Sequence, residues 1–135
     1  MRVSAKVDYA LRALLELAAA PPGHVKGERL AQAQQIPPKF LENILTELRR
    51  AEIVATQRGV EGGYRLARPA DEITVADVIR ALEGPIASVR GVRPEQVEYV
   101  GPARALQGLW IGLRASMRAV LEGTTLADLV ERAEG

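Results

Sequence analysis

Side chains that can hydrogen-bond to base edges lie at helical spacing in the segment from residue 38 to residue 52. Lys39, Glu42 and Asn43 are close enough in sequence for a helix to present them on one side, and Arg49 continues that side. In the major groove of DNA a lysine donates to guanine, an asparagine pairs with adenine and a glutamate accepts from cytosine. The spacing therefore predicts a DNA-reading face. The alternative is that Glu42 pairs with Lys39 or Arg49.

The sequence around this segment predicts a winged helix-turn-helix. A short helix over 27–34 is followed by Pro37 and Pro38, which end one helix and suit the start of the next. The next helix is expected to bury Phe40, Leu41, Ile44, Leu45 and Leu48. Two β-prone segments, 53–57 and 63–67, then flank a tip whose glycines permit positive φ. No Gly-Lys-Ser/Thr follows these glycines, so a nucleotide-binding loop is not favoured. We predict a mainly α fold with a small β-hairpin wing.

Further contacts with DNA are predicted from this arrangement. Arg58 at the wing is placed to enter the minor groove, where its charge is drawn to narrow, A·T-rich sequence. Polar and cationic side chains near the N-terminus, together with Lys26 and Arg65, are candidates for phosphates, which position a protein without specifying sequence. Each could equally be an ordinary solvated side chain. The complete set of predicted DNA contacts is Arg2, Ser4, Lys6, Tyr9, Lys26, Pro38, Lys39, Phe40, Glu42, Asn43, Arg49, Arg58, Gly59, Gly62 and Arg65.

Composition and charge distribution agree with a nucleic-acid partner. The chain has 135 residues, of which 47% are hydrophobic, enough for one core. Residues 1–68 hold 11 Lys/Arg and 7 Asp/Glu, a net of +4, whereas residues 69–135 hold 7 and 10, a net of −3. No apolar run approaches the ~20 residues of a membrane span, and charges recur through the first segment, unlike a secretory signal. We expect a cytoplasmic protein with no membrane partner.

The C-terminal part of the chain predicts a dimerisation element. We assign 1–84 to the winged helix-turn-helix domain, 85–101 to a connector that is a possible sensor region, and 102–135 to a long helix and a short terminal helix. A helix over 102–122 is about 30 Å long, more than the core of a winged helix needs. Crossing of two such helices would form a homodimer whose recognition helices, ~34 Å apart, reach successive major grooves. The predicted dimerisation residues are Leu106, Leu109, Trp110, Leu113, Met117 and Val120.

Short motifs spread over almost the whole chain resemble those of a known family. They are Ser4-Ala5-Lys6, Asp8-Tyr9-Ala10, Ile36-Pro37, Leu41-Glu42 with Leu45 and Leu48-Arg49, Arg58-Gly59, Gly62-Gly63-Tyr64, Ile79 through Leu82-Glu83-Gly84, Trp110, and Thr125-Leu126-Ala127-Asp128-Leu129. Together they resemble the bacterial winged-helix regulators of the Rrf-two family, the IscR, NsrR and CymR type. The resemblance implies a homodimer built on the long helix that binds double-stranded DNA at operator palindromes, usually as a repressor.

The chain departs from this family in its cysteines. Iron–sulfur members carry three cysteines before the long helix, whereas this chain has no cysteine and one histidine. We therefore predict no iron–sulfur cluster, no other cofactor and no metal site. Asp8 falls where some members supply a carboxylate to the cluster, and here it is expected to be a helix-start charge.

The sequence leaves the signal and one competing function open. The expected effector is a small molecule or a partner protein. The cleft between the connector, the first helix and the long helix is one place for a ligand, and a purely structural connector is the alternative. An enzyme is not predicted, because no cysteine nucleophile exists and no serine stands in a recognisable catalytic motif. The competing function is a winged helix that binds a metabolic enzyme or another regulator.

Overall fold

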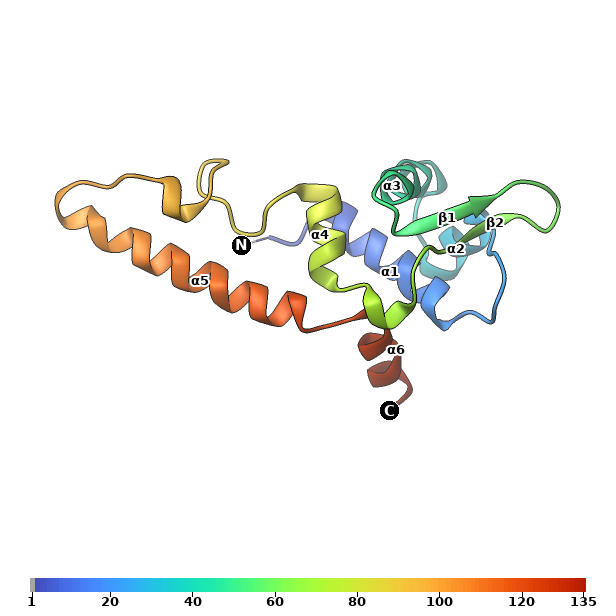
Figure 1. The fold of residues 1–135 in the computed structure, drawn as a ribbon. Helices are drawn as coiled ribbons and strands as arrows, with labels where there is room; N and C mark the ends of the chain where they lie inside the picture. The colour runs from blue at the N-terminus through green and yellow to red at the C-terminus, as the bar shows by residue number, and fades with distance from the viewer. Residues whose placement is uncertain (1) are drawn as a thin grey trace.

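The computed structural model describes residues 2–135 as a helical body with two projections (Figure 1). The wing extends from one end of the body, and a long helix with the connector beside it extends from the other. The elements are α1 (Ala5–Ala19), α2 (Gly27–Gln34), α3 (Pro38–Arg50), β1 (Val54–Gln57), β2 (Gly63–Leu66), η1 (Ala70–Glu72), α4 (Val75–Glu83), η2 (Pro94–Gln96), η3 (Gly101–Arg104), α5 (Ala105–Glu122) and α6 (Leu126–Glu134). The predicted mainly α fold with a hairpin wing is confirmed.

The core of the body forms where α1, α3 and α4 meet. The fully buried side chains include Leu14 of α1, Leu48 of α3 and Val78 of α4. Burying side chains of this size contributes roughly 1.5–3 kcal/mol each. Because the apolar residues of α3 recur every three or four positions, one side of this helix is buried and its polar side faces outward.

Local signals set the helix starts. The Ser4 hydroxyl accepts from the amide of Val7 and caps α1. Thr74 with Asp77, and Thr125 with Asp128, form capping boxes at α4 and α6. The pKa of Asp128 is lowered by the hydrogen bond from the Thr125 amide and then by that from the Thr125 hydroxyl.

The end of the chain returns to the body after α5. The amide of Val75 donates to the carbonyl of Thr124 at 2.9 Å, and the amide of Leu126 donates to the carbonyl of Ile73 at 3.0 Å. Leu126 is buried in the core. Beside this return Glu122 accepts from Arg80 and Arg118, which lower its pKa through these hydrogen bonds. The C-terminal end of α5 is therefore fixed to α4.

Three expectations from the sequence need correction. Helix α3 ends at Arg50 rather than near residue 52, because Glu52 adopts a left-handed backbone with φ of 60°. The long helix begins at Ala105, after a 3₁₀ turn, rather than at residue 102. Phe40, expected in the buried stripe of α3, is 41% exposed because it lies at the edge where α3 meets α1.

Candidate DNA-reading surface

The predicted base-reading side chains lie on the polar face of α3 and are exposed to solvent. Lys39, Glu42 and Asn43 are all exposed. Lys39 and Glu42 approach each other only to 3.9 Å, with side-chain exposures of 91% and 65%, so this ion pair is weak and leaves both groups accessible. Arg49 is also exposed, at the C-terminal end of the helix. The N-terminal half of α3 is thus built as a free hydrogen-bonding surface.

An aromatic contact fixes the first turn of α3 against α1. The rings of Tyr9 and Phe40 meet edge to face, with centroids 5.6 Å apart and planes at 81°. The guanidinium of Arg12 lies 5.3 Å from the centre of the Tyr9 ring and also pairs with Asp8 at 2.7 Å. Tyr9 therefore orients the reading helix, and Asp8 serves as a partner for Arg12 in the first turns of α1.

Some predicted phosphate contacts already have partners within the protein. The Ser4 hydroxyl bonds to the carboxylate of Glu83, and the Lys6 ammonium pairs with Glu47 at 2.8 Å. These contacts join α1 to α4 and to α3. Arg2 and Pro38 are exposed and remain available at the surface. A phosphate role for Ser4 and Lys6 stays a prediction, and their contacts show that they also hold the body together.

The wing is docked on the body by its base and by one side chain. Its strands pair antiparallel from Val54 opposite Leu66 to Gln57 opposite Gly63. Tyr64 of β2 exchanges two backbone hydrogen bonds of 2.8 Å with Val25. The Lys26 ammonium, predicted to contact phosphate, donates to the Gly59 carbonyl at 2.7 Å. These bonds connect the wing to the segment that leads into α2.

The glycines of the wing have different functions. Gly59 has φ of 106°, which agrees with the expectation of positive φ at the tip. Gly62 is buried, and a Cβ there would lie 2.1 Å from the carbonyl oxygen of Gln57. Its requirement for glycine therefore comes from close backbone approach, which sequence patterns do not reveal.

The outer surface of the wing presents charge and one apolar side chain. Arg58 and Arg65 are both exposed, and Arg65 donates to the Leu66 carbonyl at 3.0 Å. Val60, which sequence reasoning did not select, is 91% exposed at the tip. Its only signal in the sequence is its position between the tip glycines. The wing therefore exposes Arg58 and Val60 together.

The long helix α5 has a large uncovered apolar surface. All 18 of its residues are exposed or half-buried. Leu106, Leu109, Leu113 and Val120 are 39%, 57%, 37% and 66% exposed, whereas the other predicted dimerisation residues, Trp110 and Met117, are half-buried.

A mostly apolar cleft continues this surface onto the body. It has a volume of about 710 Å³, and its lining includes Val3, Ile79, Ile86, Met117 and Leu121. The apolar surface of α5 is thus joined to that of the body. Within the described part of the chain, no helix is long and apolar enough to span a membrane.

Hydrogen bonds from α5 hold the connector. The Gln107 amide donates to the carbonyls of Pro94, Glu95 and Val97 at 3.0 to 3.3 Å. Arg114 donates to the Ile86 carbonyl at 3.1 Å. Among residues 2–135 no group of three His, Asp or Glu side chains is placed to hold a metal ion. The connector, which lacks clear sequence periodicity, is therefore ordered by side chains of α5.

Comparison with known proteins identifies a consistent set of relatives. A family model described as "Rrf2: Iron-dependent Transcriptional regulator" matches residues 3–132. A Mycobacterium tuberculosis protein provisionally named as an HTH-type transcriptional regulator is 55% identical over 130 residues, covering 96% of this chain and 81% of that protein. The HTH-type transcriptional regulator CymR of Bacillus subtilis is 37% identical over 136 residues, covering 100% of this chain and 94% of that protein.

Solved structures show the same fold. The structure of CymR, the global cysteine regulator of B. subtilis, superposes with a TM-score of 0.84 at 35% identity, covering 98% of each chain. The structure of T. potens IscR gives a TM-score of 0.81 at 31% identity, covering 98% of this chain and 88% of the other. The winged-helix architecture and the long helix are thus shared along nearly the full length.

Proposed function

The chain belongs to the Rrf2 family of transcriptional regulators, and we propose that it represses transcription as a homodimer bound to a palindromic operator. Members of this family are regulators rather than enzymes, and DNA is the partner that family membership supports. The observation that carries the proposal is the combination of an exposed polar face on α3 with a wing docked beside it. As a regulator of transcription, the protein is expected to work in the cytoplasm, where the bacterial chromosome lies.

The uncovered surface of α5 supports the homodimer. Leu109 and Val120 expose more than half of their side chains to water, although burying each would contribute roughly 1.5–3 kcal/mol. Exposed apolar side chains that gather on one helix mark an interaction site. A second copy of α5 is apolar in the same places, so a two-fold axis would cover both surfaces at once. Such a dimer also presents two copies of α3 to successive major grooves.

The contacts made by the connector support a regulator without an iron–sulfur cluster. The family description includes iron, but this chain has no cysteine to supply thiolate ligands. Gln107 and Arg114 of α5 hold the connector through its carbonyls. The residues present do not fit the cluster, and we therefore propose that DNA binding needs none.

Anaerobic treatment with ferrous iron and sulfide tests this proposal. We expect the treated protein to show no cluster absorption in the visible range and unchanged operator affinity, because no thiolate is available. A bound cluster, or operator binding that appears only after iron loading, would contradict the proposal.

A separate variant tests how the connector is held. Gln107→Leu removes the side-chain donor to the connector carbonyls, so it is expected to lower the thermal midpoint of unfolding relative to the unaltered chain.

Replacement of the reading side chains tests DNA recognition. A duplex selected by the protein from a random-sequence pool serves as operator in fluorescence anisotropy. We expect Asn43→Ala and Arg58→Ala each to weaken binding roughly tenfold, because each loses contacts in a groove. Affinity should also fall steeply with salt. A reporter whose promoter overlaps the selected sequence should be transcribed less when the protein is present.

Controls separate recognition from folding and assembly in this experiment. Both side chains are exposed, so the variants should keep the thermal midpoint and the oligomeric state of the unaltered chain. Arg132→Ala, on α6, is a matched loss of an exposed side chain away from the reading surface and should bind DNA normally. Unchanged operator affinity in both Asn43→Ala and Arg58→Ala would show that the reading surface is assigned wrongly.

A further inference from the structure

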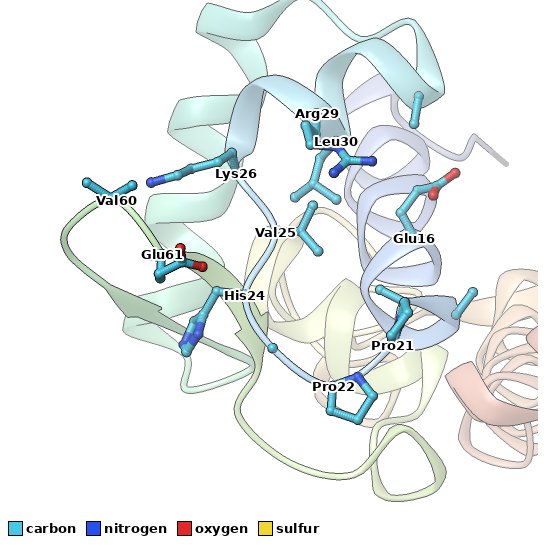
Figure 2. Close-up of a pocket in the computed structure, with 15 residues that line it drawn as sticks. Glu16, Pro21, Pro22, His24, Val25, Lys26, Arg29, Leu30, Val60 and Glu61 are labelled. Atoms are coloured by element: carbon cyan, nitrogen blue, oxygen red, sulfur yellow. The ribbon is translucent and has the colours of Figure 1, made fainter.

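A second cleft lies between the body and the wing, away from α5. It has a volume of about 510 Å³ and is bounded by the end of α1, the segment leading into α2, the start of α2 and the wing tip (Figure 2). This volume is within the range of small-molecule sites. Val25, Leu30 and Pro21 give the cleft an apolar lining.

Opposite charges stand on two helices that border this cleft. Figure 2 shows Arg29 of α2 and Glu16 of α1 near the apolar side chains of Leu30 and Val25. The Glu16 carboxylate is held by a hydrogen bond of 2.6 Å from the Gln34 amide. Within the described residues Arg29 and Glu16 do not form an ion pair. Both charges therefore retain bonding capacity toward a molecule placed between them.

The charges on the wing side balance in the same way. Lys26 and Glu61 both line the cleft there, and the Lys26 ammonium donates to Gly59. With His24 counted as neutral, the lining holds two cationic side chains, Lys26 and Arg29, and two anionic ones, Glu16 and Glu61. A purely anionic or purely cationic ligand would pair with one sign of charge and lie near the other, like-charged side chains. A zwitterion matches both signs.

We propose that this cleft binds a small zwitterion of the α-amino-acid class. The ligand carboxylate pairs with the Arg29 guanidinium, which suits bidentate recognition. The ligand ammonium pairs with Glu16, and a short apolar side chain packs on Val25 and Leu30. Nothing covalent occurs, so the site is one of recognition.

The position of the cleft couples such a ligand to the wing. The segment that lines it also bonds to the wing, through Val25 with Tyr64 and Lys26 with Gly59. Glu61 and Gly62 of the wing complete the lining. A ligand bound to Glu16, Arg29, Val25 and Leu30 fixes the segment that holds the wing, and it therefore opposes detachment of the wing. This part rests on the proposed DNA-binding function, and it predicts that ligand and operator each raise the affinity for the other.

Calorimetric titration of the full chain without DNA tests the site. The probes are L-alanine, L-valine and L-leucine. We expect at least one of these amino acids to bind with a Kd below about 1 mM. Two half-ligands serve as controls: isovalerate lacks the ammonium group of valine, and isobutylamine lacks its carboxylate. Each half-ligand is expected to bind at least roughly tenfold more weakly than valine. Arg29→Gln and Glu16→Gln should each weaken amino-acid binding roughly tenfold, because each removes one charged partner.

Matched variants and a second measurement make the result decisive. Arg132→Gln and Glu131→Gln, both exposed on α6, make the same changes outside the cleft and should leave binding unaltered. Absence of binding by all the amino acids, equal binding by the half-ligands, or normal binding by both cleft variants would overturn the site. If an amino acid binds but operator affinity is the same with and without it, the coupling is overturned and the site stands. Because the titration contains no DNA, it is independent of operator recognition.

Discussion

Glutamate at both Leu109 and Leu113 is expected to convert the protein to monomers and to lower its operator affinity by at least about 100-fold. These side chains lie on the exposed side of α5, so the substitutions disturb no buried position of the single chain. In a dimer joined through α5 they would place four unpaired carboxylates in an apolar interface, which is strongly unfavourable. A monomer presents only one copy of α3, so it loses the gain in affinity from bivalent binding, which is typically 10²- to 10⁴-fold.

Mass measured by light scattering after size exclusion, with anisotropy on the same samples, checks this prediction. Ala133→Glu makes a matched change at an exposed alanine of α6 and should leave the dimer and the affinity unchanged. Circular dichroism should show the same helix content in all variants. Persistence of dimers in the double variant would place the interface somewhere other than this side of α5.

Alanine at Gly62 is expected to disrupt the wing and to lower operator affinity by roughly 100-fold. Its Cβ would lie 2.1 Å from the Gln57 carbonyl oxygen and 2.8 Å from the carbonyl carbon of Arg58. Both neighbours are backbone, so no side chain can rotate away, and the hairpin must open or shift. Overpacking of this kind costs up to about 3 kcal/mol. If this strain destabilises the wing in its DNA-bound form, it corresponds to a loss of operator affinity of roughly 100-fold.

Alanine at Gly59 provides the matched control in the same hairpin. A Cβ there meets nothing within 4 Å, so only the strain of φ at 106° is added. We expect a smaller loss of affinity than for Gly62→Ala. Amide hydrogen exchange should show faster exchange in β1 and β2 of Gly62→Ala while α1 and α3 keep their protection. Equal affinity of the two variants would mean that the close approach at Gly62 does not determine the form of the wing.

The features that local sequence determines were predicted well. The bounds of α2 follow from turn residues that act within one helical turn. The turn at Pro37 and the uncovered side of α5 likewise follow from the residue types. The residue types along the chain are therefore enough to assign the fold class.

Features that depend on contacts between distant segments were not predicted. Phe40 follows the apolar period of α3, but its exposure depends on how Tyr9 of α1 lies beside it. The partners of Lys6 and Gln107 lie on other elements, and residues of these types are mostly solvated. The requirement at Gly62 depends on the separation of two backbone segments. Such distances are set by the assembled fold, and the pattern of residue types does not contain them.

The return of the chain after α5 has a consequence for how these regulators diverge. Just beyond the C-terminal end of α5, Thr124 bonds to Val75 of α4 and Leu126 bonds to Ile73, before α4. Along the helix, Gln107 and Arg114 bond to the connector. A helix attached along its length in this way cannot swivel freely about its end. In a dimer joined through α5, the length of α5 would therefore fix the separation of the two copies of α3. Insertions in α5 and changes in the spacing of operator half-sites would then have to evolve together, whereas substitutions on the polar face of α3 could change the recognised bases alone.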